Sequence, residues 1–183
     1  MQNANEICGE CRKAHFYFER AYSACIYEGV LKELIHAFKY KQKVSLARLF
    51  AKLMVDFIKE NDEIIKGVDM LTFVPLHSKR LWEREFNQSK IFALVISNTY
   101  GLRLADTLQK TKTTKPQNEL PREGRLTNLT DAFMIKGQAP LDGLNILLVD
   151  DVMTTGATLS ECSKVLLGTG AASVRCLTLA RGM

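Results

Sequence analysis

The sequence lacks any long hydrophobic run: nowhere do apolar residues fill the roughly 18 consecutive positions that a membrane-spanning helix needs. Its first residues also lack the basic-then-apolar pattern of a signal peptide. The five cysteines are scattered unevenly along 183 residues, which does not fit the paired disulfide frameworks of short secreted chains. We therefore expect a cytoplasmic protein with no membrane insertion.

Two common nucleotide-binding motifs are also missing. There is no Gly-Lys-Thr/Ser of a Walker loop and no G-x-G-x-x-G of a dinucleotide fingerprint. Internal repeats and low-complexity tracts are absent as well. The hydrophobic content of 46% is that of a globular protein with one sizeable core, and the length suits one domain with a short appendage.

The spacing of apolar residues predicts alternating strands and helices. Helical spacing runs from residue 31 to about residue 59, with a basic interruption at 39–43, and recurs at 87–98 and 157–167. Strands are expected at 24–27, 70–74, 102–107, 132–135, 146–149 and 173–179. This alternation predicts an α/β fold with a mainly parallel sheet flanked by helices. We divide the chain into an N-terminal segment, 1–29, with a Cys-x2-Cys knuckle, and a main domain, 30–183.

Residues 146–159 carry the strongest functional signal. Two acids end a predicted buried strand, where open α/β sheets bind ligands, and a loop of small residues then leads into a helix. The free N–H groups at a helix N-terminus suit a phosphate, whereas carboxylates accept hydrogen bonds from ribose hydroxyls. A merely capped helix would explain one threonine but not this whole set. The segment predicts a ribose 5-phosphate site, with Asp150 and Asp151 on the ribose and Thr154, Thr155, Gly156, Ala157 and Thr158 on the phosphate.

The same segment resembles the 5-phosphoribosyl-1-diphosphate (PRPP) signature of type I phosphoribosyltransferases. Residues 27–40, 73–88 and 112–117 are similar to stretches of the ComF-type competence proteins, and the likeness extends from about Cys8 to Leu179. The resemblance implies a type I phosphoribosyltransferase fold, PRPP binding, and a role with single-stranded DNA and the DNA-uptake machinery in natural transformation. One departure is Glu85, which replaces the family's glycine in Arg-Gly-Phe-Asn-Gln; a positive φ there would alter the diphosphate loop.

The loop after the second predicted strand, 75–86, is expected to bind the diphosphate. A diphosphate needs backbone donors and cations, and the candidates are Leu76, His77, Lys79, Arg80 and Arg84. Plain surface charge is the alternative for the three basic residues. Mg²⁺ favours oxygen ligands and keeps several waters, so it would bridge diphosphate and ribose oxygens.

Zinc is a further candidate, at the N-terminal knuckle. Cys8 and Cys11 supply half of a tetrahedral site, and the family often has a second such pair. Zn²⁺ binding therefore depends on whether His15 or a residue outside this stretch completes the site. The other cysteines, at positions 25, 162 and 176, fall at apolar positions and are expected in the core.

Clustered charge suggests where DNA could bind. The net charge is only +5, but Lys39, Lys41 and Lys43 could track a single strand, and Phe16, Tyr17, Phe18 and Tyr40 could stack on its bases. The alternatives are a solvated helix face and a miniature core beside the knuckle.

Two other functions stay open. One is an active phosphoribosyltransferase that transfers ribose 5-phosphate to an unknown nucleobase or amine; ribosyl transfer needs little acid–base help, so the lack of an evident general base does not exclude it. The other is a regulator that senses the metabolite. The long polar segment 110–131 is expected to be either a flexible hood that closes over the sugar or a docked β-hairpin.

Overall fold

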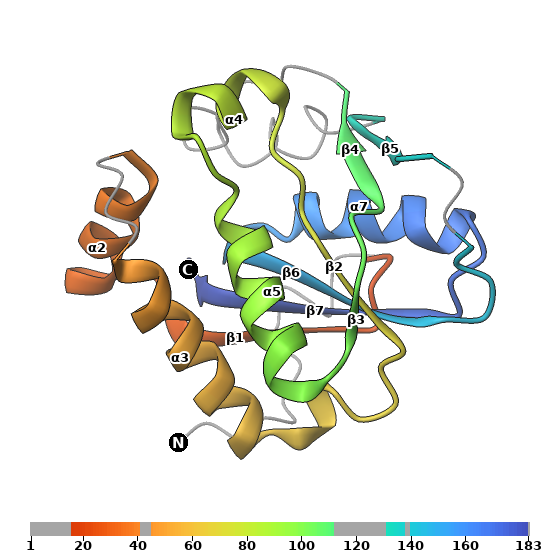
Figure 1. The fold of residues 1–183 in the computed structure, drawn as a ribbon, viewed down its shortest axis with the longest axis horizontal. Coiled ribbons are helices and arrows are strands. Elements are labelled where there is room, and N and C mark those ends of the chain that lie inside the picture. Colours follow the sequence, from red (N-terminus) through yellow and green to blue (C-terminus); the bar gives the residue numbers. More distant parts are fainter. Residues whose placement is uncertain (1–15, 41–44, 112–130, 138–139, 183) are drawn as a thin grey trace.

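A five-stranded sheet forms the centre of the protein (Figure 1). The computed structural model describes residues 16–40, 45–111, 131–137 and 140–182. The strand order is β1 (Arg20–Ile26), β7 (Ser173–Arg181), β6 (Asn145–Met153), β2 (Met70–Phe73) and β3 (Arg103–Leu104), and every neighbouring pair is parallel. The predicted α/β fold with a parallel sheet between helices is confirmed.

Helices cover both faces of the sheet. On one face lie α2 (Gly29–Tyr40), α3 (Leu46–Glu60) and α5 (Gln88–Tyr100), with the short 3-10 helix η1 (Asp62–Ile64) after α3. On the other lie α7 (Ala157–Gly168) and an antiparallel hairpin of β4 (Leu108–Lys110) and β5 (Phe133–Ile135). Among the described residues, no helix has the length and apolar content to cross a membrane.

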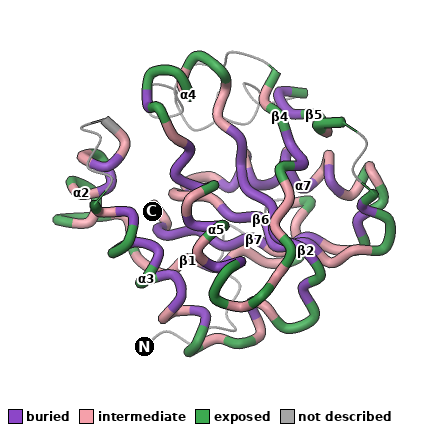
Figure 2. The backbone as a smooth tube through the Cα atoms, in the orientation of Figure 1, coloured by how far each residue is buried: buried purple, intermediate pink, exposed green. Residues whose placement is uncertain are grey.

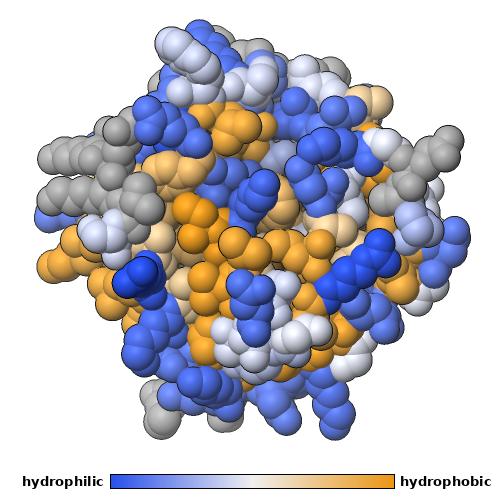
Figure 3. All heavy atoms as spheres, viewed as in Figure 1, coloured by the Kyte–Doolittle hydropathy of each residue, from blue (hydrophilic) through white to orange (hydrophobic). Residues whose placement is uncertain are grey.

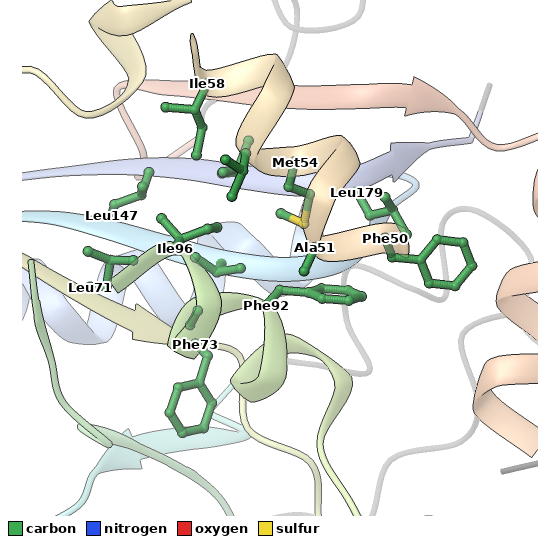
Figure 4. Packing of buried hydrophobic residues seen from close by; sticks show 14 of the residues in the cluster. Phe50, Ala51, Met54, Ile58, Leu71, Phe73, Phe92, Ile96, Leu147 and Leu179 are labelled. Atoms are coloured by element: carbon green, nitrogen blue, oxygen red, sulfur yellow. The ribbon is translucent and has the colours of Figure 1, made fainter. Parts of the chain in front are cut away.

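The core between α3, α5 and the sheet explains why α3 is a helix at this place. Its buried residues recur every three or four positions and so form one apolar stripe. In Figure 4 this stripe faces side chains from α5 and from strands β2, β6 and β7. Burying one such large side chain contributes about 1.5–3 kcal/mol. The facing residues include Phe50, Met54 and Ile58 of α3, Phe92 and Ile96 of α5, and Leu71, Leu147 and Leu179 of the strands.

Burial decreases from the central strands outward. Residues 146–149 of β6 are at most 1% exposed, as expected of a strand covered on both faces. Figure 2 shows this buried centre and the more exposed α2 and α4 (Ser78–Arg84) at its periphery. Figure 3 shows apolar atoms gathered in the middle of the same view, over α5, where Leu94 is 48% exposed.

The chain reverses its direction of travel across the sheet between β2 and β6. The connection from β2 through α5 leads outward to β3, whereas the connection from β6 through α7 leads the other way, to β7. In open parallel sheets this reversal opens a crevice at the carboxyl ends of the two strands, and ligands bind there. The candidate ribose acids lie near the carboxyl end of β6, and the candidate diphosphate segment follows β2.

The predicted and the observed elements differ in several places. The strand predicted at 102–107 is reduced to β3, and β4 at Leu108–Lys110 was not predicted. β1 begins at Arg20, four residues before the predicted start of the strand at 24–27, and pairs with β7 along its length. Because β1 is an edge strand of mixed composition, its first residue could not be predicted from an apolar pattern. Residues 78–84 are helical and not loop. Strand β6 continues to Met153, so that both acids lie inside its ladder.

Candidate functional site

Asp150 and Asp151 lie near the carboxyl end of β6 and are held from three directions. The Ser89 hydroxyl, in the first turn of α5, donates to Asp150 Oδ1 at 2.8 Å, and the Asp151 backbone N–H donates to the same oxygen at 2.8 Å. The Lys39 ammonium, in the last turn of α2, lies 2.7 Å from Asp151 Oδ2. The side chains of that ion pair are only 18% and 13% exposed. Segments far apart in the sequence thus converge on the two acids.

Burial changes the acidity of this pair. Burial, and after it the neighbouring charge of Asp151, raise the pKa of Asp150 to about 7. The hydrogen bonds from Asp151 N–H and Ser89 and the charge of Lys39 act in the opposite direction. The balance leaves a carboxyl that exchanges its proton near neutral pH.

The predicted phosphate loop forms the start of α7. Gly156 is the residue before the helix and has φ +77°, a conformation that favours glycine. A Cβ at this position would lie 3.0 Å from the Phe16 ring, so a larger residue would require that ring to shift. The Ala157 N–H donates weakly to Thr155 Oγ1, at 3.4 Å. The helix N-terminus, the small residues and the hydroxyls are therefore assembled as the sequence suggested, with Thr154, Thr155 and Thr158 half-buried.

The aromatic segment 16–18 packs against this loop. Phe16 stacks on Phe18 with ring centroids 4.8 Å apart, and the Tyr17 N–H donates to Ser160 Oγ at 3.2 Å. Phe16 and Phe18 are half-buried, and Tyr17 is 44% exposed. The packing favours a structural role for the two phenylalanines over base stacking.

The candidate diphosphate residues lie on and before α4. His77 caps this helix, with Nδ1 accepting from the Lys79 N–H at 3.3 Å, and Leu76 precedes it half-buried. Lys79 is exposed, Arg80 is half-buried and Arg84 is only 8% exposed. The solvent exposure of the three basic residues of α4 therefore differs widely.

Lys110, at the end of β4, adds a cation that sequence analysis did not assign to the site. Burial and the nearby charge of Arg80 lower the pKa of Lys110 to about 8, and Asp150 acts in the opposite direction. Its ammonium lies 5.4 Å from the centre of the Phe133 ring. The β4–β5 pair thus brings a basic side chain toward the acids. Residues 112–130, between these two strands, lie outside the described residues, so the choice between a closing hood and a docked hairpin for the segment 110–131 stays open.

The stretch 87–89 ties α5 to both strand ends. The Asn87 side chain accepts from the Lys90 N–H and donates to the Val74 carbonyl at 3.0 Å, directly after β2. Gln88 is 1% exposed, and its Nε2 has no hydrogen-bond partner among the residues that the structure describes. Ser89 reaches Asp150. Sequence analysis missed these roles, although an asparagine before a helical stretch is itself a helix-cap signal.

Glu85 has φ +65°, so the position at which the resemblance expects glycine does adopt the left-handed conformation. A side chain with a Cβ costs about 1–2 kcal/mol there. We expect Glu85→Gly to raise the free energy of unfolding by about 1 kcal/mol, measured by urea denaturation. The matched control is Glu83→Gly inside α4, which should lower it; a loss of stability in Glu85→Gly would contradict the strain argument.

The remaining candidate residues lie outside the described part of the chain or in the core. Cys8, Cys11, Lys41 and Lys43 are outside it, and the described residues contain no cluster of three or more metal-ligating side chains. Cys162 and Cys176 are fully buried and free, and burial raises the pKa of each thiol, while Cys25 is free and half-buried. The expectation that these three thiols serve packing agrees with this placement.

Comparison with known proteins agrees with this geometry. A family model described as "Phosphoribosyl transferase domain" matches residues 87–183. The "DNA utilization protein YhgH" of Salmonella typhimurium is 31% identical, over 95% of this chain and 77% of that protein. "Competence protein F" of Haemophilus influenzae is 29% identical over 99% of this chain and 81% of that protein. "Competence protein ComFC" of Bacillus subtilis is 27% identical over 98% of this chain and 74% of that protein. The chain belongs to the ComF-type proteins of the phosphoribosyltransferase family.

Proposed function

We propose that this protein binds PRPP at the carboxyl ends of β6 and β2 and acts on single-stranded DNA during DNA uptake. The observation that carries the proposal is the adjacency of the two acids on β6 to the N-terminus of α7, at the reversal point of the sheet. The family membership supports it, since relatives carry the names "Competence protein F" and "DNA utilization protein".

Each part of PRPP has a complementary group in this arrangement. The carboxylates of Asp150 and Asp151 accept hydrogen bonds from the ribose hydroxyls, and the loop 154–158 with the start of α7 binds the 5′-phosphate. The diphosphate faces the α4 region, where Lys79 and Arg80 supply positive charge. Mg²⁺ fits such an oxygen-rich site, carried on the oxygens of the ligand, where it would neutralise diphosphate charge.

Calorimetry with PRPP and Mg²⁺ tests the binding half of the proposal. We expect saturable binding with a stoichiometry of about one. Ribose 5-phosphate should bind more weakly, since it lacks the diphosphate. Absence of PRPP binding would overturn the proposal. Release of diphosphate in the presence of nucleobase or amine acceptors would show that the protein also turns PRPP over.

An exposed tryptophan supports the proposed binding of single-stranded DNA. Trp82 is the single tryptophan of the chain, lies on α4 and is 85% exposed. Leu81 beside it is 43% exposed, and Lys79 is exposed on the same helix. Solvent-facing aromatic rings next to cations are the features with which proteins stack and track single strands. Because there is one tryptophan, its fluorescence reports on α4 directly.

The salt dependence of DNA binding tests the basic segment after α2. Lys39 is engaged with Asp151, so the charge reversal is confined to Lys41→Glu with Lys43→Glu. If both lysines contact phosphates, the slope of log affinity against log salt should fall by about 1.4, or about 0.7 for each lost contact. Quenching of Trp82 by an oligothymidylate provides the readout. The control is Lys59→Glu with Lys66→Glu, exposed residues before the start of β2; equal slopes in both variants would exclude this segment from the DNA surface.

A further inference from the structure

Lys39 belongs to the sugar-phosphate site, although the sequence places it in a basic run next to Lys41 and Lys43. It is the basic residue in the last turn of α2, and its ammonium contacts Asp151 Oδ2 at 2.7 Å. With 18% of its side chain exposed, it is largely withdrawn from solvent. An ion pair this shielded is screened much less by salt than one on the surface. The contact is thus a component of the site and not a surface coincidence.

The neighbouring residue fixes Lys39 in this place. Phe38 is 1% exposed, and its ring lies 5.5 Å from Phe50 of α3, 5.3 Å from Phe86 and 5.9 Å from Phe92 of α5. Helix α2 lies at the periphery of the fold (Figure 1), and this aromatic cluster attaches its last turn to α3 and α5. Because α5 also carries Ser89, the same packing holds the donors on both acids.

Two adjacent carboxylates at a buried strand end repel each other, so without a cation one of them retains a proton. The groups that face Asp150 come from five elements: Ser89 of α5 and Lys39 of α2, Lys110 of β4, and the thiols of Cys162 on α7 and Cys176 on β7. The thiols are neutral, because burial raises their pKa. The positive charge of Arg80 is close enough to Lys110 to lower the pKa of Lys110. Lys39 is in direct contact with the acidic pair, through Asp151.

We propose that Lys39 is a positioning residue that favours the ionised form of Asp150 and Asp151, in which they accept hydrogen bonds from the ribose hydroxyls of PRPP. This inference rests on the proposed function of the site. A protonated carboxyl offers one O–H donor and loses part of its capacity to accept, so it binds a sugar diol less well. The last turn of α2 is then coupled to ligand binding through charge.

The pH dependence of binding separates this role from a structural one. In Lys39→Met, PRPP affinity should fall about tenfold at pH 7 for each unit by which the apparent pKa of the pair rises, and should return toward the wild-type value at pH 9. Lys39→Arg should keep the wild-type profile. Lys32→Met, an exposed lysine on the same helix, serves as the matched control. A loss of affinity that is the same at every pH would overturn the proposal.

A second measurement needs no ligand. Carbon NMR of ¹³C-labelled aspartate side chains reports the titration of the acidic pair in the free protein, where the apparent pKa should be higher in Lys39→Met than in wild type. Identical titration curves would overturn the role of Lys39, even if PRPP binds. A wild-type protein that binds no PRPP would instead overturn the proposed function and leave the NMR result standing.

Discussion

Asp150→Asn combined with Asp151→Asn should abolish PRPP binding, a loss of at least a hundredfold, while the protein stays folded. In the proposed site each carboxylate would accept hydrogen bonds from ribose hydroxyls, and hydrogen bonds to charged groups contribute about 1.5–3 kcal/mol each. Asparagine keeps the shape of the side chain but has one acceptor oxygen and no charge. Two such losses account for the predicted effect.

Asp150→Asn alone should increase the stability of the free protein. The pKa of Asp150 is raised to about 7 in the folded state, so between about pH 4 and pH 7 the folded chain binds a proton that the unfolded chain has released. The contribution of this residue to stability is therefore present at low pH and lost as the pH rises toward 7. The single variant Asp150→Asn escapes that loss, and we expect it to be more stable than wild type at pH 7 by roughly 1–3 kcal/mol.

Calorimetric titration and thermal unfolding at pH 5 and pH 7.5 provide the measurements. The stability gained by Asp150→Asn should be larger at pH 7.5, with a melting temperature raised by roughly 2–4 °C for each kcal/mol. Asp62→Asn, an exposed acid at the start of η1, is the control and should change neither quantity. Unchanged PRPP affinity in the double variant would remove these acids from the site.

Phe92→Ala should cost about 3–5 kcal/mol of unfolding free energy, the largest stability effect that we expect from a single substitution. Phe92 is fully buried on α5, and its ring contacts Phe38 at 5.9 Å and Phe50 at 6.4 Å between centroids. Truncation removes the ring that joins α2, α3 and α5. Because α5 carries Ser89 and α2 carries Lys39, PRPP affinity should fall as well, although Phe92 is not assigned to the ligand.

Urea denaturation measures the first effect and calorimetry the second. The matched control is Leu94→Ala on the same helix, which is 48% exposed and should cost less than about 1 kcal/mol. Phe92→Leu should recover most of the stability, since it refills much of the cavity. A loss below about 1.5 kcal/mol in Phe92→Ala would mean that the aromatic cluster does not hold the three helices together.

The elements with strong apolar patterns could be predicted well from sequence. The helices at 29–40 and 46–60 follow from a spacing of 3.6 residues, and β2, β6 and β7 follow from short apolar runs. Polar or short elements were missed. The edge strand β1 has a mixed composition, and α4 has seven residues without an apolar stripe. Weak local signals of this kind are decided by pairing and packing with distant segments.

The sequence by itself determined the set of candidate ribose- and phosphate-binding residues, because two acids, a glycine and three threonines lie within nine consecutive residues. Their order along one strand, one loop and one helix places them together whatever the rest of the fold does. Only the tertiary structure decided what controls those acids. Ser89 and Lys39 reach Asp150 and Asp151 from two other helices. A residue's charge environment depends on neighbours across the fold, and no periodicity or motif in the chain records that proximity.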